Sequence, residues 1–123
     1  MSSSSQIYIA VVDDDESLCR SLGRLLRASG MQPITYGSAE EFLADDKHPK
    51  FDCLVLDVQL GGMSGIELQR QLVSQKEAAP IIFITAQDDP EAKAEAVASG
   101  CEAYFRKSDS GAEILEAIRR AVA

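Results

Sequence analysis

Short apolar runs recur along the chain, and polar residues follow each of them. Four of the runs end next to charged or hydroxyl side chains: Ile7–Val12 before Asp13–Asp15, Cys53–Leu56 before Asp57, Ile81–Ile84 before Thr85 and Ala86, and Tyr104–Phe105 before Arg106 and Lys107. The runs are rich in β-branched and aromatic residues, and a segment with helical spacing follows each one. Strands that alternate with helices run parallel, so their carboxyl ends are expected to meet at one edge of a sheet.

The segments between the runs have apolar residues at helical spacing, with local start and stop signals. The expected core-facing positions are Leu18, Leu22, Leu25, Leu26, Phe42, Leu43, Ile66, Leu68, Leu72, Val73, Ile114, Leu115, Ile118 and Val122. Helix starts are expected at an Asp-Pro pair and at two capping boxes, and helix ends at two glycines that can adopt the left-handed conformation. These signals are Asp89 with Pro90, Ser38 with Glu41, Ser110 with Glu113, Gly30 and Gly100.

One further segment, Pro33–Tyr36, is predicted to be a short second strand, and the run at Tyr104–Phe105 is predicted to be the fifth strand, Ala103–Phe105. Five strands alternating with five helices predict a flavodoxin-like (βα)5 fold, a doubly wound parallel sheet with helices on both faces and right-handed crossovers. The expected strand order is 2-1-3-4-5, in which a crevice opens between the first and third strands. Asp13, Asp14 and Asp57 would meet at that crevice.

Length and composition favour a single domain over residues 7–123, with residues 1–6 as a disordered polar tail. The net charge of −8 argues against nonspecific nucleic-acid binding by this domain. Cys19, Cys53 and Cys101 are odd in number and lack CxxC spacing, which indicates reduced thiols and a cytoplasmic location. No apolar stretch approaches the length of a membrane span.

The carboxylates at the predicted crevice would repel one another, and without a cation one of them would be expected to take up a proton. A Mg2+ ion resolves this conflict, because it prefers oxygen ligands and usually keeps waters and phosphate oxygens in its shell. Asp57 is placed to act as an attacking carboxylate on a phosphoryl group. Lys107 would supply a positive charge to the phosphoryl oxygens, and Thr85 a hydroxyl donor. The polarity of loops explains any one of these residues, whereas the set as a whole favours a functional site.

Five motifs follow one another in the chain: Val11–Asp14, Leu54–Asp57, Met63–Gly65, Thr85–Ala86 and Tyr104–Lys107. In this order they resemble response-regulator receiver domains of two-component signalling systems, over nearly the whole chain. The stretches Ser38–Leu43 and Ile82–Thr85 are similar to the FixJ-type subfamily. The resemblance implies a signalling phosphoacceptor rather than an enzyme. It would take a phosphoryl group on Asp57 from the phosphohistidine of a sensor histidine kinase, and would assist its own phosphorylation and dephosphorylation.

The resemblance also implies roles around Asp57. The implied Mg2+ ligands are Asp13, Asp14, Asp57 and the backbone carbonyl of Gln59, and the implied phosphoryl-binding groups are Lys107, Thr85 and the backbone amide of Ala86. Thr85 would move toward the phosphoryl group and Tyr104 would turn inward behind it, which shifts the face built from the fourth helix, the fifth strand and the fifth helix. Gln59 and Gln87 would flank the phosphoryl site and tune its hydrolysis, whereas Asp15 is expected to be an extra acid that faces solvent.

Two further partners follow from the resemblance. One is a second copy of the chain, bound through the same face to give a homodimer. The other is a DNA-binding output domain, if the chain is a fragment of a longer regulator. No direct contact of this domain with nucleic acid or with a membrane is expected.

Three positions depart from the family pattern. Gly61 stands where proline is usual, so the loop after Asp57, Leu60–Gly65, should be more flexible. The glycines of that loop, Gly61, Gly62 and Gly65, are expected to supply its turn geometry. Cys101 stands where alanine is common, and its small thiol is expected to pack there. Ser108 stands where a proline normally follows the lysine through a cis bond. The Lys107–Ser108 bond is therefore either trans in a rearranged loop, or cis at a cost of roughly 2.5–4 kcal/mol.

Three other functions share parts of the pattern. A phosphatase or transferase of the haloacid-dehalogenase kind also uses Asp and Mg2+, but it needs an acid two residues after the nucleophile, where Gln59 stands. A flavin-binding electron carrier would have a phosphate-binding loop after the first strand, where Asp13–Glu16 would instead repel a phosphate. A pseudo-receiver, folded but not phosphorylated, stays open because of Gly61 and Ser108, although the complete acidic set argues against it.

Overall fold

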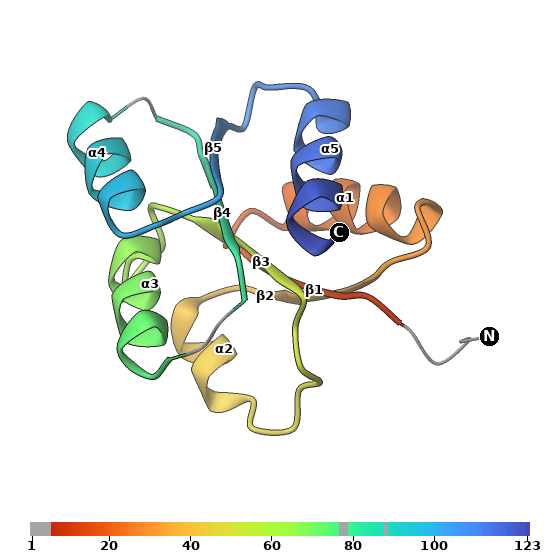
Figure 1. Cartoon of the computed structure of the whole chain (residues 1–123), viewed down its shortest axis with the longest axis horizontal. Coiled ribbons are helices and arrows are strands. Elements are labelled where there is room, and N and C mark those ends of the chain that lie inside the picture. Colours follow the sequence, from red (N-terminus) through yellow and green to blue (C-terminus); the bar gives the residue numbers. More distant parts are fainter. Residues whose placement is uncertain (1–5, 77–78, 88) are drawn as a thin grey trace.

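The computed structural model describes residues 6–76, 79–87 and 89–123, which form five strands and five helices in strict alternation (Figure 1). The elements are β1 (Tyr8–Val12), α1 (Glu16–Ala28), β2 (Gln32–Tyr36), α2 (Ala39–Ala44), β3 (Cys53–Asp57), α3 (Gly65–Ser74), β4 (Ile81–Thr85), α4 (Pro90–Ala98), β5 (Ala103–Arg106) and α5 (Gly111–Val122). Residues 1–5 of the predicted tail lie outside the described residues, and Gln6 is exposed ahead of β1. Within the described ranges, no helix is long and apolar enough to cross a membrane.

The strands form one parallel sheet in the order β2-β1-β3-β4-β5, which confirms the predicted fold. All five residues of β3 and of β4 are buried, as expected for central strands covered on both faces. In Figure 1, α1 and α5 cover one face of the sheet, and α2, α3 and α4 cover the other. Each face has its own apolar core, one around Leu26 and Ile118 and the other around Phe42, Leu68 and Phe83.

Most of the predicted helix signals are confirmed. Asp89 caps α4 through hydrogen bonds from the N–H groups of Glu91 and Ala92, Pro90 follows it, and Gly30 and Gly100 have φ angles of +83° and +92°. The complete capping box lies at Ser64 with Glu67, where it was not predicted. At Ser38 and Ser110 the structure gives only the serine half of the box, in which the hydroxyl accepts the N–H of Glu41 or Glu113.

Two predictions about the segment that follows β3 are wrong. Val73 was expected to face the core but is 54% exposed, because it lies on the outer side of the last turn of α3. Gly65 is not a turn residue, since it begins α3, and its lack of a side chain serves packing. A Cβ atom there would lie 2.1 Å from the backbone oxygen of Asp57, so only glycine lets α3 approach β3 this closely. A positive φ, +85°, occurs at Gly62 instead.

The Lys107–Ser108 bond is trans. Lys107 and Ser108 are the central residues of a tight turn, which is closed by a 2.9 Å hydrogen bond from the Asp109 N–H to the Arg106 carbonyl oxygen. The Asp109 carboxylate in turn accepts the Arg106 N–H. Neither central residue has a positive φ. The turn therefore orients Lys107 without the cis bond that a proline at position 108 would favour.

We expect Ser108→Pro to destabilise the protein by about 1–3 kcal/mol, because a proline disfavours the helical backbone conformation of the preceding turn residue, Lys107. Thermal unfolding of the variant measures this effect. Ser108→Ala is the matched control, since it removes the hydroxyl but leaves the turn geometry unchanged. A Ser108→Pro protein as stable as the Ser108→Ala protein would contradict the turn geometry described here.

Candidate functional site

Two buried aspartates lie side by side at the carboxyl edge of the sheet. Val12 pairs with Leu56 in the β1–β3 ladder, so Asp13 and Asp57, the residues that follow them, emerge together. Their exposed fractions are 2% and 4%. Asp14 is exposed beside them. Parallel pairing thus unites acids that are far apart in sequence, as the strand pattern predicted.

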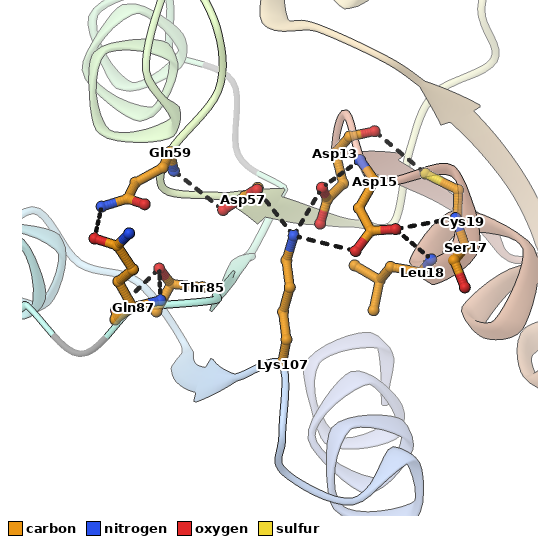
Figure 2. Close-up of polar contacts among 10 residues, drawn as sticks. All are labelled: Asp13, Asp15, Ser17, Leu18, Cys19, Asp57, Gln59, Thr85, Gln87 and Lys107. Atoms are coloured by element: carbon orange, nitrogen blue, oxygen red, sulfur yellow. Dashed lines mark hydrogen bonds and ion pairs between the residues drawn. The ribbon is translucent and has the colours of Figure 1, made fainter.

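Lys107 lies between the two buried carboxylates (Figure 2). Its ammonium group donates hydrogen bonds to Asp13 Oδ1 at 3.1 Å and to Asp57 Oδ2 at 3.2 Å, and it is 3.8 Å from Asp15 Oδ2. Its own backbone N–H donates to the Thr85 carbonyl oxygen at 2.8 Å, which fixes the base of the side chain on β4. Burial lowers the pKa of Lys107, but the hydrogen bond to Asp13 and the negative charge of Asp57 outweigh it, and the pKa is raised.

The carboxyl group of Asp13 has a raised pKa. Burial raises the pKa of its carboxyl to about 6, and the charge of Asp57 adds to the rise, against the hydrogen bond from the Asp15 N–H and the contact with Lys107. The folded protein therefore holds a proton on Asp13 at a pH where the unfolded chain has already released it. At neutral pH the site contains more negative charge than the one lysine can balance.

The donor set fits a hard divalent cation. Asp13, Asp14 and Asp57 each offer a carboxylate oxygen, and these oxygens lie within 4.8 Å of one another. Asp13 Oδ2 is buried and accepts no hydrogen bond within the described chain. A buried carboxylate oxygen without a partner is costly, and a cation would satisfy it.

The raised pKa of Asp13 predicts how the stability of the metal-free protein depends on pH. Because the folded protein binds the extra proton between about pH 4 and pH 6, its stability should fall as pH rises through that window, by up to about 3 kcal/mol from this group. We expect Asp13→Asn to remove this fall and to raise the melting temperature at pH 7. Thermal unfolding in EDTA from pH 4 to pH 7 tests this, with Asp46→Asn, a change at an exposed loop residue, as the control. If the stability of wild type and of Asp13→Asn changed with pH in the same way, the raised pKa would not belong to Asp13.

Asp15 has a structural role that sequence reasoning missed. Its carboxylate accepts the N–H groups of Ser17 and Leu18 and caps α1, so it is not merely a solvent-facing acid. The signal was present, because an aspartate immediately before a helical segment is a strong N-cap. The cap fixes the turn that carries Asp13 and Asp14 over the end of β1.

Thr85 and Gln87 form the opposite wall of the site. The Thr85 hydroxyl donates to the Gln87 carbonyl oxygen at 3.1 Å and accepts the Gln87 N–H at 3.3 Å, so it is engaged within its own loop. The Gln87 side chain accepts a 3.2 Å hydrogen bond from Gln59 Nε2, which links the loop after β4 to the loop after β3 (Figure 2). The Gln59 N–H donates to Asp57 Oδ1 at 3.0 Å. Ala86 is exposed between Thr85 and Gln87.

Tyr104 lies behind this wall, on β5. It is half-buried, its hydroxyl oxygen is buried, and its ring packs against Phe83 with 6.1 Å between centroids. The ammonium group of Lys93 on α4 lies 5.9 Å from the centroid of the same ring. The tyrosine thus contacts both the sheet and α4.

The sequence of residues 9–119 matches the family model described as the response regulator receiver domain. The chain belongs to the response regulator receiver domain family. This receiver domain is 38% identical over 118 residues to the response regulator protein TodT of Pseudomonas putida, a match that covers 96% of the chain and 51% of TodT. The chain therefore spans about half the length of the curated relatives it matches.

Solved structures agree with this placement. The crystal structure of FixJ-N is 34% identical, with a TM-score of 0.85, and the match covers 96% of this receiver domain and 94% of that chain. A CheY-like receiver domain protein from Methanospirillum hungatei JF-1 is 25% identical, with a TM-score of 0.88, over 96% of this chain and 94% of that one. The prediction of a receiver domain is confirmed, and similarity to FixJ-N agrees with the FixJ-type subfamily. The domain is a signalling module with a phosphoacceptor fold.

Proposed function

We propose that Asp57 accepts a phosphoryl group from the phosphohistidine of a sensor histidine kinase. A carboxylate oxygen of Asp57 forms a bond to phosphorus while the bond from phosphorus to the imidazole nitrogen breaks, and the imidazole takes the electron pair. The observation that carries the proposal is the contact of Lys107 with both buried carboxylates at 3.1 and 3.2 Å. A positive charge held there can neutralise charge on the transferred group. The same complete set of residues gives no support to the pseudo-receiver alternative.

Mg2+ is the cation that the site would hold, with Asp13, Asp14, Asp57 and the backbone carbonyl of Gln59 as protein ligands. When bound, it would neutralise the carboxylates and the phosphoryl oxygens. The residues of the chain would orient the nucleophile and bind the phosphoryl oxygens. Lys107 orients the Asp57 carboxylate, and the Gln59 N–H holds its other oxygen. Thr85 and the Ala86 amide would bind phosphoryl oxygens once the Thr85 hydroxyl leaves the Gln87 backbone.

The release of Thr85 from Gln87 suggests how the signal would leave the site. Movement of Thr85 toward the phosphoryl group would open space for Tyr104 to turn inward. Because the Tyr104 ring also contacts Lys93 on α4, this would shift the α4-β5-α5 face. A homodimer through that face, and an output domain that binds DNA, are the partners that would read this change. A cytoplasmic location, indicated by three free cysteines, stays a prediction.

The amide link between Gln59 and Gln87 is expected to slow loss of the phosphoryl group, because it lies across the opening next to Asp57. Gln87→Ala should speed dephosphorylation by about three- to tenfold by admitting water. The rate of phosphoryl loss after removal of the donor measures this. Because the two side chains form one hydrogen bond with each other, the double variant Gln59→Ala/Gln87→Ala should lose its phosphoryl group only slightly faster than Gln87→Ala alone. Fully additive effects, or a slower loss in Gln87→Ala, would argue against the link.

Incubation of the wild-type protein with acetyl phosphate and Mg2+, followed by intact mass measurement, tests the proposed function. One phosphoryl group should be added with Mg2+ present, and none when EDTA replaces the ion. A protein that gains no phosphoryl mass under these conditions would refute the proposed function.

A further inference from the structure

The loop between β3 and α3 forms one wall of the site and has few internal hydrogen bonds. At its start, the Val58 N–H donates to the Ile84 carbonyl oxygen at 3.3 Å. At its end, Ser64 and Glu67 cap α3. Between these anchors, of the four backbone N–H groups at positions 60–63, only that of Met63 has a hydrogen-bond partner in the described part of the chain.

That partner is Glu40, from the first turn of α2. Its Oε2 atom accepts the Met63 N–H at 2.8 Å, across 23 positions of sequence. The hydrogen bond lowers the pKa of the Glu40 carboxyl, so the side chain stays ionised and the bond is charge-assisted. An otherwise exposed glutamate thus ties a second helix to the loop.

Gly62 makes room for this contact. Its φ of +85° favours glycine, and a Cβ atom at this position would lie 2.7 Å from Glu40 Oε2. Any larger residue would push the carboxylate away from Met63. A Cβ atom at Gly61, by contrast, would have nothing within 4 Å, so Gly61 makes no such close contact. The side chain of Leu60 is buried and that of Met63 packs against the core, but neither holds the backbone N–H groups. The hydrogen bond from Met63 to Glu40 therefore adds a polar restraint on the loop backbone, where within the described residues the N–H groups of positions 60–62 have no partner.

We propose that Glu40 is a positioning residue, which holds the β3–α3 loop and with it the Gln59 backbone carbonyl that the proposed Mg2+ site would use. The inference rests on the proposed function of this site. A loop that is free to move presents the carbonyl in fewer molecules, and apparent Mg2+ affinity falls with that fraction. Loss of the hydrogen bond between Glu40 and the Met63 N–H should therefore weaken Mg2+ binding without unfolding the domain.

The test compares Glu40→Ala with Glu41→Ala. Both changes remove one negative charge from neighbouring exposed positions of α2, but only Glu40 contacts the loop. Each variant is titrated with Mg2+ while its amide chemical shifts are recorded. The Mg2+ affinity of Glu40→Ala should be roughly three- to tenfold weaker than that of Glu41→Ala. Melting temperatures of the two variants should agree. Glu40→Gln keeps an acceptor oxygen and should recover part of the loss.

The Met63 amide gives a readout that needs no metal. In the wild-type protein without Mg2+, its proton shift should follow the titration of Glu40 at acidic pH, and this response should vanish in Glu40→Gln. Adding Gly61→Pro to Glu40→Ala should restore affinity, because proline restricts the loop by another route.

Equal Mg2+ affinities for Glu40→Ala and Glu41→Ala would overturn the proposal, as would a Met63 amide that titrates in Glu40→Gln. Phosphorylation of the wild type is measured in parallel. If the wild type binds Mg2+ but takes up no phosphoryl group, the proposed function fails. A loss of Mg2+ affinity in Glu40→Ala but not in Glu41→Ala would still support the positioning role of Glu40.

Discussion

Asp57→Asn is expected to abolish phosphoryl uptake from acetyl phosphate. The amide that replaces the carboxylate is a poor nucleophile and cannot form the acyl phosphate. The fold should persist, because asparagine keeps an oxygen that can accept the Gln59 N–H. Intact mass spectrometry in Mg2+ measures the loss, and amide chemical shifts verify that the sheet is intact.

Asp46→Asn is the matched control for this experiment, since it changes an exposed aspartate outside the site. It should be phosphorylated at the wild-type rate. Uptake of a phosphoryl group by Asp57→Asn at that same rate would place the nucleophile on another residue and contradict the account.

Gly65→Ala is expected to destabilise the protein more than any other glycine substitution proposed here. Alanine normally favours a helix over glycine by about 1 kcal/mol. At Gly65, however, the added Cβ atom would meet the Asp57 carbonyl oxygen at 2.1 Å and its carbon at 2.9 Å. These are backbone atoms of a buried strand and cannot move aside cheaply. We expect a loss of about 3 kcal/mol or more and a fall in melting temperature on the order of 10 °C.

Gly61→Ala is the control for Gly65→Ala, because a Cβ atom at Gly61 would have nothing within 4 Å. Gly61→Ala should leave stability unchanged, or raise it by about 0.4–1 kcal/mol because alanine lowers the conformational entropy of the unfolded chain. Gly65→Ala should also slow phosphorylation, since relief of the clash forces α3 and the Asp57 backbone apart and disturbs the position of the nucleophile. A Gly65→Ala protein as stable as Gly61→Ala would show that α3 and β3 are not packed as described.

The sequence was sufficient to predict the sheet and the meeting of its acidic residues. Apolar runs such as Cys53–Leu56 and Ile81–Ile84 are long enough for a strand and too short for a helix, and the helical stripes between them imply parallel strands. Once the strand order followed, Asp13, Asp57 and Lys107 had to lie at one edge. Their contacts agree with that expectation.

The features that could not be predicted depend on tertiary partners. Nothing in the local pattern shows that Gly65 faces the Asp57 backbone, or that Glu40 bonds the Met63 amide. Val73 fits a helical stripe, yet α3 is covered on one side only, so the residue stays exposed. The trans turn at Lys107–Ser108 depends on two hydrogen bonds between Arg106 and Asp109, which neither Lys107 nor Ser108 reveals by itself.

The most direct test of the central claim is chemical location of the phosphoryl group. An acyl phosphate is reduced by borohydride to an alcohol, so treatment of the phosphorylated wild type should convert one aspartate into homoserine. Peptide mass spectrometry after digestion should find homoserine at position 57 and unmodified aspartate at positions 13, 14 and 15. Homoserine at any of those three positions, or none at position 57 in protein that carries the phosphoryl mass, would contradict the account.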